Sequence, residues 1–537
     1  MEFSDKIFKA FLSEMNDLDQ FRMSYELEHP SVSMDREDPD VKRLIEAMAF
    51  FSARTHLAGV ENITAARLRL FQQFFPFLLS PIPSMGLMQA QVSGMLQERT
   101  FFPRGTELLV TTTSGDAAIY RTLADLTVLP ITFSDAKLIV ISGGYRLLLS
   151  FNAMYPRNDD IGRLSLNVNY LNNYQNSLYL LDVLKNSMKN CFVSFDEVVD
   201  ENTTGTRCNL SFGSHQEIGS QSKNEPTMHP IQASRFFFHF PSRDLFMHMD
   251  VPEIEKAWDQ FTLCIDLDRK IWPSELILNK DMFRLFTVPV ENSVHASAAP
   301  FVFDGTKEKF RIQHLEPDAG YELQHVTGVY KILDGITQPL RPGILAGGEG
   351  SYEVEYRETQ NQKNYYLNLH ASQAFMNPVT IGVDAMWLQP DFSDKVSQKL
   401  NVNPYRRHIA GINWRIAEEL TPHQHNVFHK NMDVFIYLLS LRGKSSLEYN
   451  DIMCLLQVQG SVFQGEYKAI ETLFKSARVE QTKVQTTGGN SLKLIYHLGF
   501  EECLPAMKPM IDGFIKQVEN ILDSWVSEAP VETAMEI

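Results

Sequence analysis

Apolar positions in the first thirty residues recur at spacings of three, four or seven, and charged residues lie between them. This pattern predicts one amphipathic helix over residues 3–28, which Pro30 ends. Its apolar stripe is narrow and close to a 3.5-residue repeat, as in helices that pack into a bundle. Either the stripe packs on this chain's own helices or it joins a bundle shared with partner chains. The stripe is formed by Phe8, Phe11, Met15, Leu18 and Tyr25.

The stretch 37–84 predicts two further helices, at 39–56 and 62–75. The first begins after Asp38, which can accept a hydrogen bond from the first turn, and proline suits the first helical position. Prolines then impose an extended exit toward Met85, because each fixes φ and biases the preceding residue away from helix. One face of the first helix carries Val41, Leu44, Ile45 and Met48, and the terminating prolines are Pro76, Pro81 and Pro83.

Beyond residue 84, runs rich in Val, Ile, Leu and Thr are bounded by turn residues, which predicts a β-rich middle of the chain. One helix is expected at 173–189. Residues 200–231 are rich in Asn, Thr, Gly and Ser, so we expect a linker or long loop there. The aromatic run at 236–246 is interpreted as a buried strand and turn. The expected strands are 85–92, 107–113, 117–133, 138–155, 164–168, 260–267, 282–290, 363–370 and 379–387.

The last segment predicts two helices, two strands and a long helix, which is typical of a small α+β domain. These elements are expected at 447–457, 466–475, 478–486, 491–497 and 503–525, with a frayed end from about Ser527. The predicted fold class is α+β multidomain, with an N-terminal helical bundle, β-rich middle domains and a small α+β C-terminal domain. The expected boundaries are 1–84 for the N-terminal helical region, 85–199 for the first β-rich domain, 200–231 for the linker or long loop, 232–430 for the second β-rich domain and 431–537 for the C-terminal domain.

Charge and composition exclude some classes of function. The formal net charge of −17 and the lack of a basic stripe argue against nucleic acid as a partner, because phosphate binding needs clustered Lys and Arg. The five cysteines are widely spaced, which favours free thiols over a disulfide framework. The N-terminus lacks the apolar core of a signal peptide, and no apolar run reaches the length of a membrane span. We therefore expect a cytoplasmic protein with no direct membrane insertion.

Candidate chemistry is sparse. His423, His425 and His429 form the pattern H-x-H-x-x-x-H, and on a helix His425 and His429 would share a face that could bind zinc. No Glu or Cys stands at a useful spacing, and Pro422 favours a helix start as the explanation. The glycine loop at 340–350 lacks the G-K-[ST] of a phosphate-binding loop. We expect no catalytic, cofactor-binding or metal-binding residues; a hydrolase without a recognisable motif and a carbohydrate- or peptide-binding β module remain alternatives.

Several blocks of sequence resemble the TssF family of the bacterial type VI secretion system. The most specific blocks lie within 37–85, as E-D-P-x-V-x-R-L-I-E-A-x-A-F and F-P-x-x-L-x-P-I-P-S-M. Later blocks occur in the family's order. Among them are Pro103-Arg104-Gly105-Thr106-Glu107, Tyr120-Arg121-Thr122, Pro289-Val290 with Asn292, and Gly320-Tyr321-Glu322. The loop at 387–392 departs from the family's usual C-T-N-R-D-L-P.

The resemblance implies a structural baseplate wedge subunit and no enzymatic activity. It implies that two copies of the chain join one TssG-like subunit, and that the wedge binds TssK, TssE and a VgrG-like spike hub beneath the sheath. Other subunits would bring such a protein to the inner membrane. Because the function would then depend on interfaces, the expected partner-binding residues are Phe8, Phe11, Met15, Leu18, Tyr25, Leu44 and Met48.

Overall fold

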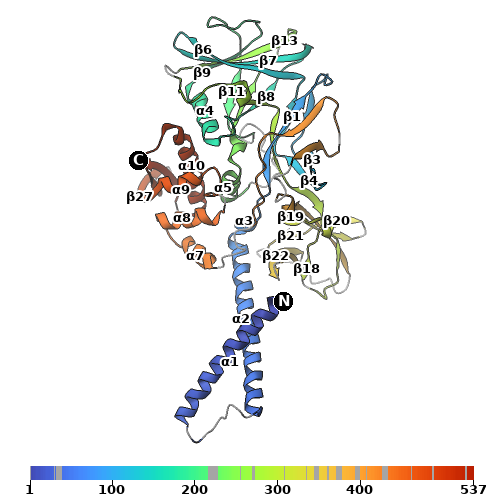
Figure 1. Cartoon of the computed structure of the whole chain (residues 1–537), viewed down its shortest axis with the longest axis vertical. Helices are drawn as coiled ribbons and strands as arrows, with labels where there is room; N and C mark the ends of the chain where they lie inside the picture. Colours follow the sequence, from blue (N-terminus) through green and yellow to red (C-terminus); the bar gives the residue numbers. More distant parts are fainter. Residues whose placement is uncertain are drawn as a thin grey trace. The chain divides into compact units, whose positions relative to one another are not determined.

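A computed structural model shows two compact units, each containing several separate stretches of the chain (Figure 1). The first unit comprises Met1–Pro76, Ser297–Leu315 and Val326–Ala385, and the second comprises Phe77–Ala296, Glu316–His325 and Met386–Ile537. The structure describes residues 2–536 except 30, 32–38, 216–227, 254–255, 269–271, 308, 334, 344–349, 360–361, 371–377, 394–398, 407, 426–432, 461, 487–488 and 527–528.

The first unit begins with two long helices, α1 (Glu2–Glu28) and α2 (Pro39–Phe74). The predicted helix over 3–28 is confirmed, whereas the predicted break between two helices near residue 60 is wrong. Gly59 lies inside α2, where a glycine costs about 1 kcal/mol relative to alanine but does not prevent helix formation. The 36-residue helix therefore continues almost to the proline at position 76, as the terminating prolines require.

The other described residues of the first unit lie mainly in two β-sheets, whose strands β16, β19 and β24 also include residues of the second unit. One sheet has the order β16-β24-β19-β20, with β17 beside β24, and the other has the order β18-β23-β22-β21. The strands predicted at 363–370 and 379–387 are confirmed. The bounds are β16 (Val294–Ser297), β17 (Phe301–Phe303), β18 (Lys309–Arg311), β19 (Glu322–Leu333), β20 (Ile336–Pro339), β21 (Arg341–Pro342), β22 (Ser351–Thr359), β23 (Gln362–His370) and β24 (Val379–Leu388).

A closed barrel lies in the second unit, with the strand order β1-β15-β4-β3-β25-β26. Its first strand pairs antiparallel with β15 on one side and with β26 on the other, so strands far apart in sequence close the barrel. Antiparallel pairing with alternating buried side chains is typical of such closed sheets. The bounds are β1 (Met85–Val92), β3 (Glu107–Thr112), β4 (Ala117–Thr122), β15 (Thr287–Glu291), β25 (Leu400–Pro404) and β26 (Ile412–Ile416).

Two larger sheets and a small one also lie among the described residues before position 291. Their strand orders are β10-β9-β13-β7-β6, β11-β12-β8-β14 and β2-β5. The stretch predicted as one strand at 282–290 is divided at Phe286, whose φ is +54°, so that prediction is corrected. The bounds are β2 (Thr100–Phe102), β5 (Leu126–Val128), β6 (Ile131–Ile141), β7 (Gly144–Arg157), β8 (Arg163–Val168), β9 (Met188–Ser194), β10 (Thr206–Arg207), β11 (Asn209–Phe212), β12 (Phe246–Asp250), β13 (Trp258–Leu267) and β14 (Phe283–Leu285).

The predicted helix at 173–189 is confirmed as α4 (Tyr174–Ser187). The stretch 117–133 divides into β4, β5 and the start of β6, where one strand was predicted. Within 200–231, part of the predicted linker forms β10 and β11, and residues 216–227 lie outside the described part of the chain. The strands predicted at 85–92, 164–168 and 260–267 are confirmed.

The aromatic run after the linker forms a helix, α5 (Pro230–His239), so the predicted buried strand is wrong. Pro230 occupies its first turn, and the His229 side chain accepts a hydrogen bond from Ile231 N. Phe236 and Phe238 are buried and Phe237 between them is half-buried, so the three consecutive phenylalanines reveal no helical period by themselves. A short apolar run in a buried helix and a buried strand look alike in sequence.

The C-terminal part has the predicted order of helices and strands. The described elements are α7 (Asp433–Arg442), α8 (Tyr449–Val458), α9 (Lys468–Leu473), β27 (Phe474–Thr486), β28 (Gly489–Phe500) and α10 (Lys508–Trp525). The predicted frayed end is wrong, because β29 (Val531–Glu536) pairs parallel with β28. Glu519 on α10 fixes this strand, since its carboxylate accepts hydrogen bonds from the amide and the hydroxyl of Thr533.

Residues 77–85, which we call the connecting segment, lead from the helices to β1. The segment begins within the short helix α3 (Pro76–Leu79) and is then extended. The buried Arg235 on α5 donates from Nη1 to the carbonyl oxygens of Phe77 and Ser80, at 2.7 and 3.0 Å. Ile82 and Gln424 exchange both backbone hydrogen bonds, at 2.9 and 3.0 Å.

Apolar packing and further hydrogen bonds fix the end of the connecting segment. The amide of Met85 donates to Thr421 Oγ1 at 2.9 Å, and the Ser84 carbonyl accepts from the Asn292 amide at 2.8 Å. Extended backbone inside a protein needs such partners, because each unpaired polar group costs about 1–3 kcal/mol. One apolar cluster unites the segment with α5 and β12; it contains Ile82, Met85, Leu87, Phe236, Phe240 and Phe246.

We predict that Gly59→Ala stabilises α2 by about 1 kcal/mol. No atom lies within 4 Å of the position that the new Cβ would occupy, so the gain in helix propensity is not offset by a clash. Hydrogen exchange of the amides around residue 59 should slow about fivefold. Gly59→Pro is the opposing control and should accelerate exchange; unchanged exchange in Gly59→Ala would contradict a continuous helix.

A second prediction concerns His215, which lies just after β11. Burial lowers the pKa of His215 to about 3, with His248 and Arg163 adding to the effect. Neither ring nitrogen has a hydrogen-bond partner among the described residues. The folded state therefore holds this imidazole neutral, and the unfolded chain binds the proton more strongly at acidic pH.

The contribution of His215 to stability is constant above about pH 6.5 and decreases as the pH falls toward 3. Between pH 7 and pH 5 the free energy of unfolding should fall by about 2 kcal/mol more in the wild type than in His215→Leu. Urea denaturation at both pH values measures this difference. Equal losses in the two proteins would show that His215 is not the responsible group.

Candidate partner-binding surface

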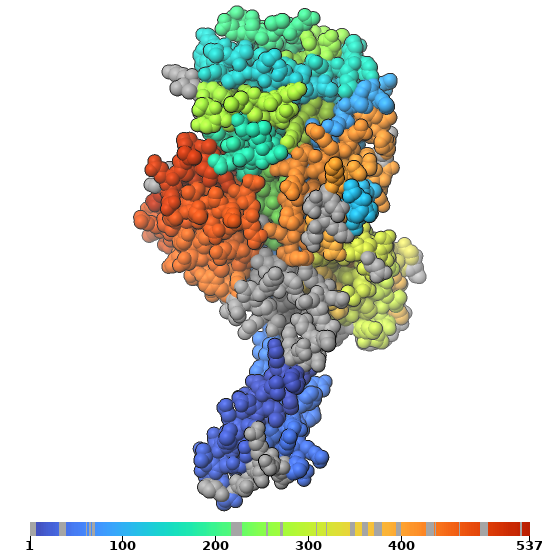
Figure 2. All heavy atoms as spheres, viewed as in Figure 1, coloured from blue at the N-terminus to red at the C-terminus, as the bar shows by residue number. Residues whose placement is uncertain are grey.

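The helices α1 and α2 contact each other and form a hairpin, whose atoms are drawn in blue in Figure 2. Glu14 on α1 accepts a hydrogen bond from Ser52 Oγ on α2 at 2.6 Å and lies 3.6 Å from His56 Nδ1. Ala49 and Ala53 on α2 are completely buried. Small residues at such positions allow two helices to approach closely.

The predicted stripe of α1 is divided between the interior of this hairpin and its surface. Glu14 is one turn from both Phe11 and Leu18, so its contacts show that this face is turned toward α2. The structure therefore supports packing on the chain's own helix for these residues. Phe11, Met15, Leu18 and Tyr25 are half-buried, whereas Phe8, Leu44 and Met48 are 59%, 62% and 53% exposed.

An exposed apolar ridge runs along α2, and it includes a residue that the sequence did not single out. Leu44, Met48 and Phe51 stand at positions i, i+4 and i+7, so they share one face, and Phe51 is 66% exposed. The spacing of Phe51 from Leu44 was the available signal. We call these three residues the α2 ridge. Further exposed apolar side chains of the hairpin are Phe8, Leu12, Phe21, Met23, Leu27, Phe50, Val60, Ile63, Leu70 and Phe74. A concentration of this kind is typical of surfaces that bind other proteins.

Several motif blocks of the second unit meet around one ion pair. Arg121 Nε donates to Glu291 Oε1 at 2.8 Å, and the Glu291 side chain is 7% exposed. Asn292 donates from Nδ2 to the carbonyl of Ile119 at 2.9 Å and accepts from the amide of Gln389. The divergent stretch 387–392, which was expected as a loop, joins the end of β24 to the short helix α6 (Pro390–Ser393) and is attached to the same network. Arg121 on β4 and Glu291 on β15 therefore join two neighbouring strands of the barrel. Their charges are stable there because buried charges need to be paired and hydrogen-bonded.

The histidines of the H-x-H-x-x-x-H pattern are not on a helix where the structure describes them, so the predicted helix start at Pro422 is wrong. His423 and His425 lie on an extended segment, because Gln424 between them pairs with Ile82. Their shared neighbour is Glu322, which the sequence spacing could not reveal. His429 lies outside the described residues.

All five cysteines are free, as the sequence predicts. Cys191 and Cys208 lie close together with their sulfur atoms 3.1 Å apart, and burial raises the pKa of the Cys264 thiol to about 12. A thiol with a raised pKa is a poor nucleophile at neutral pH.

Solved structures share this fold over nearly its whole length. A chain of the type VI secretion system TssK-TssF-TssG baseplate subcomplex matches with a TM-score of 0.70 and 14% identity, over 93% of this chain and 96% of that chain. A chain of the baseplate complex from the type VI secretion system matches with a TM-score of 0.61 and 15% identity, over 98% and 96%. The chain thus has the fold of a subunit found in type VI secretion baseplates.

The sequence itself carries the family assignment. The family described as "Type VI secretion system, TssF" matches residues 30–366, which is more than half of the chain. This chain belongs to the TssF family of the type VI secretion system. No curated protein sequence matches it significantly. Among the described helices, none combines the length and the apolar character that a membrane crossing requires.

Proposed function

We propose that this chain is a structural wedge subunit of a type VI secretion baseplate and has no enzymatic role. In this proposal two copies join one TssG-like subunit, and the wedge binds TssK, TssE, a VgrG-like spike hub and the sheath. Other subunits recruit the cytoplasmic chain to the inner membrane. The observation that carries the proposal is the match to the TssF family together with a shared fold over nearly the whole length of both chains.

The helical hairpin is the surface that we propose for the TssG-like partner and the second copy. The α2 ridge leaves three large apolar side chains exposed, and burying one such side chain stabilises a complex by roughly 1.5–3 kcal/mol. The similar fold occurs in a subcomplex that also contains TssG, which favours this occupant. Aromatic anchors such as Phe51 are typical of the centre of stable interfaces.

Co-expression of this chain with its neighbouring secretion genes, followed by native mass spectrometry, tests the proposed assembly. We expect a complex with two copies of this chain and one TssG-like chain, because the proposal requires that stoichiometry. When the TssG-like partner dissociates, the two copies of this chain should also separate from each other. A symmetric dimer of this chain would instead remain intact without the partner. A stable monomer in the presence of every neighbour would refute the proposal.

The α2 ridge can be tested separately. Leu44→Glu, Met48→Glu and Phe51→Glu together should reduce co-purification of the TssG-like chain at least about a hundredfold, since three exposed apolar groups are replaced by charges. Circular dichroism should remain unchanged because these side chains lie outside the hairpin interior.

Two controls separate binding from folding. The double variant Val140→Glu, Val198→Glu changes two side chains outside the hairpin that are 73% and 80% exposed. It should leave co-purification of the TssG-like chain unchanged. Phe11→Glu changes a half-buried residue of the hairpin, so we expect it to lower helicity. If the triple variant still binds the partner, the ridge is not the interface.

A further inference from the structure

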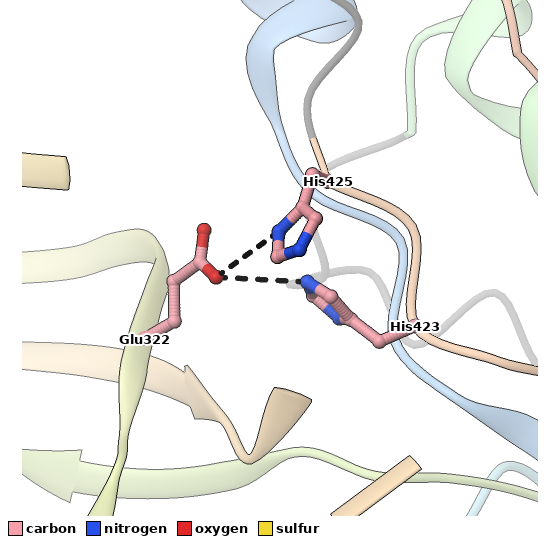
Figure 3. A group of neighbouring side chains, drawn as sticks. All are labelled: Glu322, His423 and His425. Carbon is pink, nitrogen blue, oxygen red and sulfur yellow. Dashed lines mark ion pairs between the residues drawn. The ribbon is translucent and has the colours of Figure 1, made fainter. Parts of the chain in front are cut away.

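We propose that Glu322, His423 and His425 form a binding site for a divalent transition metal, with Zn²⁺ as the favoured ion. Figure 3 shows the carboxylate of Glu322 facing both imidazole rings. Its Oε2 lies 3.6 Å from His423 Nε2 and 3.6 Å from His425 Nδ1. The three ligand atoms all lie within 4.8 Å of one another.

The backbone brings these side chains together for identifiable reasons. Side chains alternate along an extended segment, so His423 and His425 point to the same side while Gln424 pairs with Ile82. The amide of His423 is fixed by Ser393 Oγ at 3.1 Å. Glu322 begins β19 directly after a turn in which Gly320 has a φ of +70°. Glycine suits that position because its conformation is left-handed.

Burial makes the arrangement costly without a cation. The side chain of His423 is only 3% exposed, and its Nε2 has no hydrogen-bond partner among the described residues. The Glu322 side chain is 11% exposed. A buried imidazole nitrogen without a hydrogen-bond partner loses its hydration and destabilises the fold, and a buried carboxylate favours a nearby cation.

A metal ion would give the buried His423 Nε2 a partner and would share the Glu322 carboxylate with both imidazoles. Zinc binds imidazole nitrogen and carboxylate oxygen at about 2.0–2.2 Å, so two ligands in a tetrahedron are about 3.4 Å apart. The observed separations of 3.6 Å are close to this value. His425 is 54% exposed, which leaves a route for the ion from solvent and a place for a water as fourth ligand.

The chemistry of the ligands selects the class of ion. Two imidazoles and one carboxylate suit zinc and its transition-metal neighbours better than Ca²⁺ or Mg²⁺, which prefer oxygen ligands. The bound ion would join residue 322 to the segment 423–425, which is itself paired with the connecting segment. The site is therefore expected to stabilise this part of the second unit.

Metal binding to the full-length chain tests the proposal. A chelator first removes any bound metal from the protein. The protein is then titrated with ZnCl₂ and desalted, and the zinc that remains bound is measured by elemental mass spectrometry. We expect one Zn²⁺ per wild-type chain. Glu322→Gln and His423→Ala should each lower the affinity more than about tenfold. Co²⁺ in place of zinc should give the visible absorption of a tetrahedral ion, and both substitutions should abolish it.

The control variant is His497→Ala, whose imidazole also lies near two carboxylates, 3.5 Å from Glu480 and 3.6 Å from Glu536. It should retain the wild-type stoichiometry and the cobalt spectrum. Zinc-dependent slowing of hydrogen exchange at residues 420–425 provides a second measurement if His423→Ala fails to fold. A wild-type chain that binds no zinc, or equal zinc in every variant, would overturn the proposal and leave only His–Glu ion pairs.

Discussion

The hydrogen bonds that the buried guanidinium of Arg235 donates fix the connecting segment within the second unit. Burial lowers the pKa of this guanidinium to about 10, which still leaves it charged at neutral pH. A buried charge is tolerated only where polar groups replace its hydration, and here the carbonyls of Phe77 and Ser80 do so. Because those carbonyls lie at the end of α3, the cation also meets the negative end of a helix turn. The connecting segment is thereby held against α5.

The position of the connecting segment determines how the barrel is assembled. Once Ile82 pairs with Gln424, β1 is placed between β15 and β26, and the barrel can close. The same pairing presents His423 and His425 on one side of their extended segment. Removing Arg235 would leave two carbonyls of the connecting segment without this donor, so the effect would extend to both the barrel and the proposed metal site.

The sequence predicted those parts of the fold that depend on local pattern. The stripe of α1, the prolines after α2 and the alternating strands are all recognisable over short windows. The run at Phe236–Phe238 was mistaken for a strand because α5 buries its phenylalanines and shows no clear polar face there. Similarly, β29 is stabilised by β28 and by Glu519, neither of which its own residues reveal.

The candidate sites also differ in how far the local sequence predicts them. The exposed ridge of α2 is visible in the spacing of Leu44, Met48 and Phe51, although sequence cannot tell which face of a helix is left uncovered. The pairing of Glu322 with two histidines about a hundred residues away depends on strand order, so no local spacing encodes it. Long-range contacts of this kind have to be found in the folded chain.

The closure of the barrel also sets the order of events during synthesis. Met88 pairs with Ile416, so β1 leaves the ribosome long before its partner. At about 5–20 residues per second the wait is roughly 16 to 65 seconds. The pairing of α1 with α2 involves only the first 74 residues and has no such delay. The α2 ridge is therefore available to a partner, or to a chaperone, while the rest of the nascent chain is still incomplete.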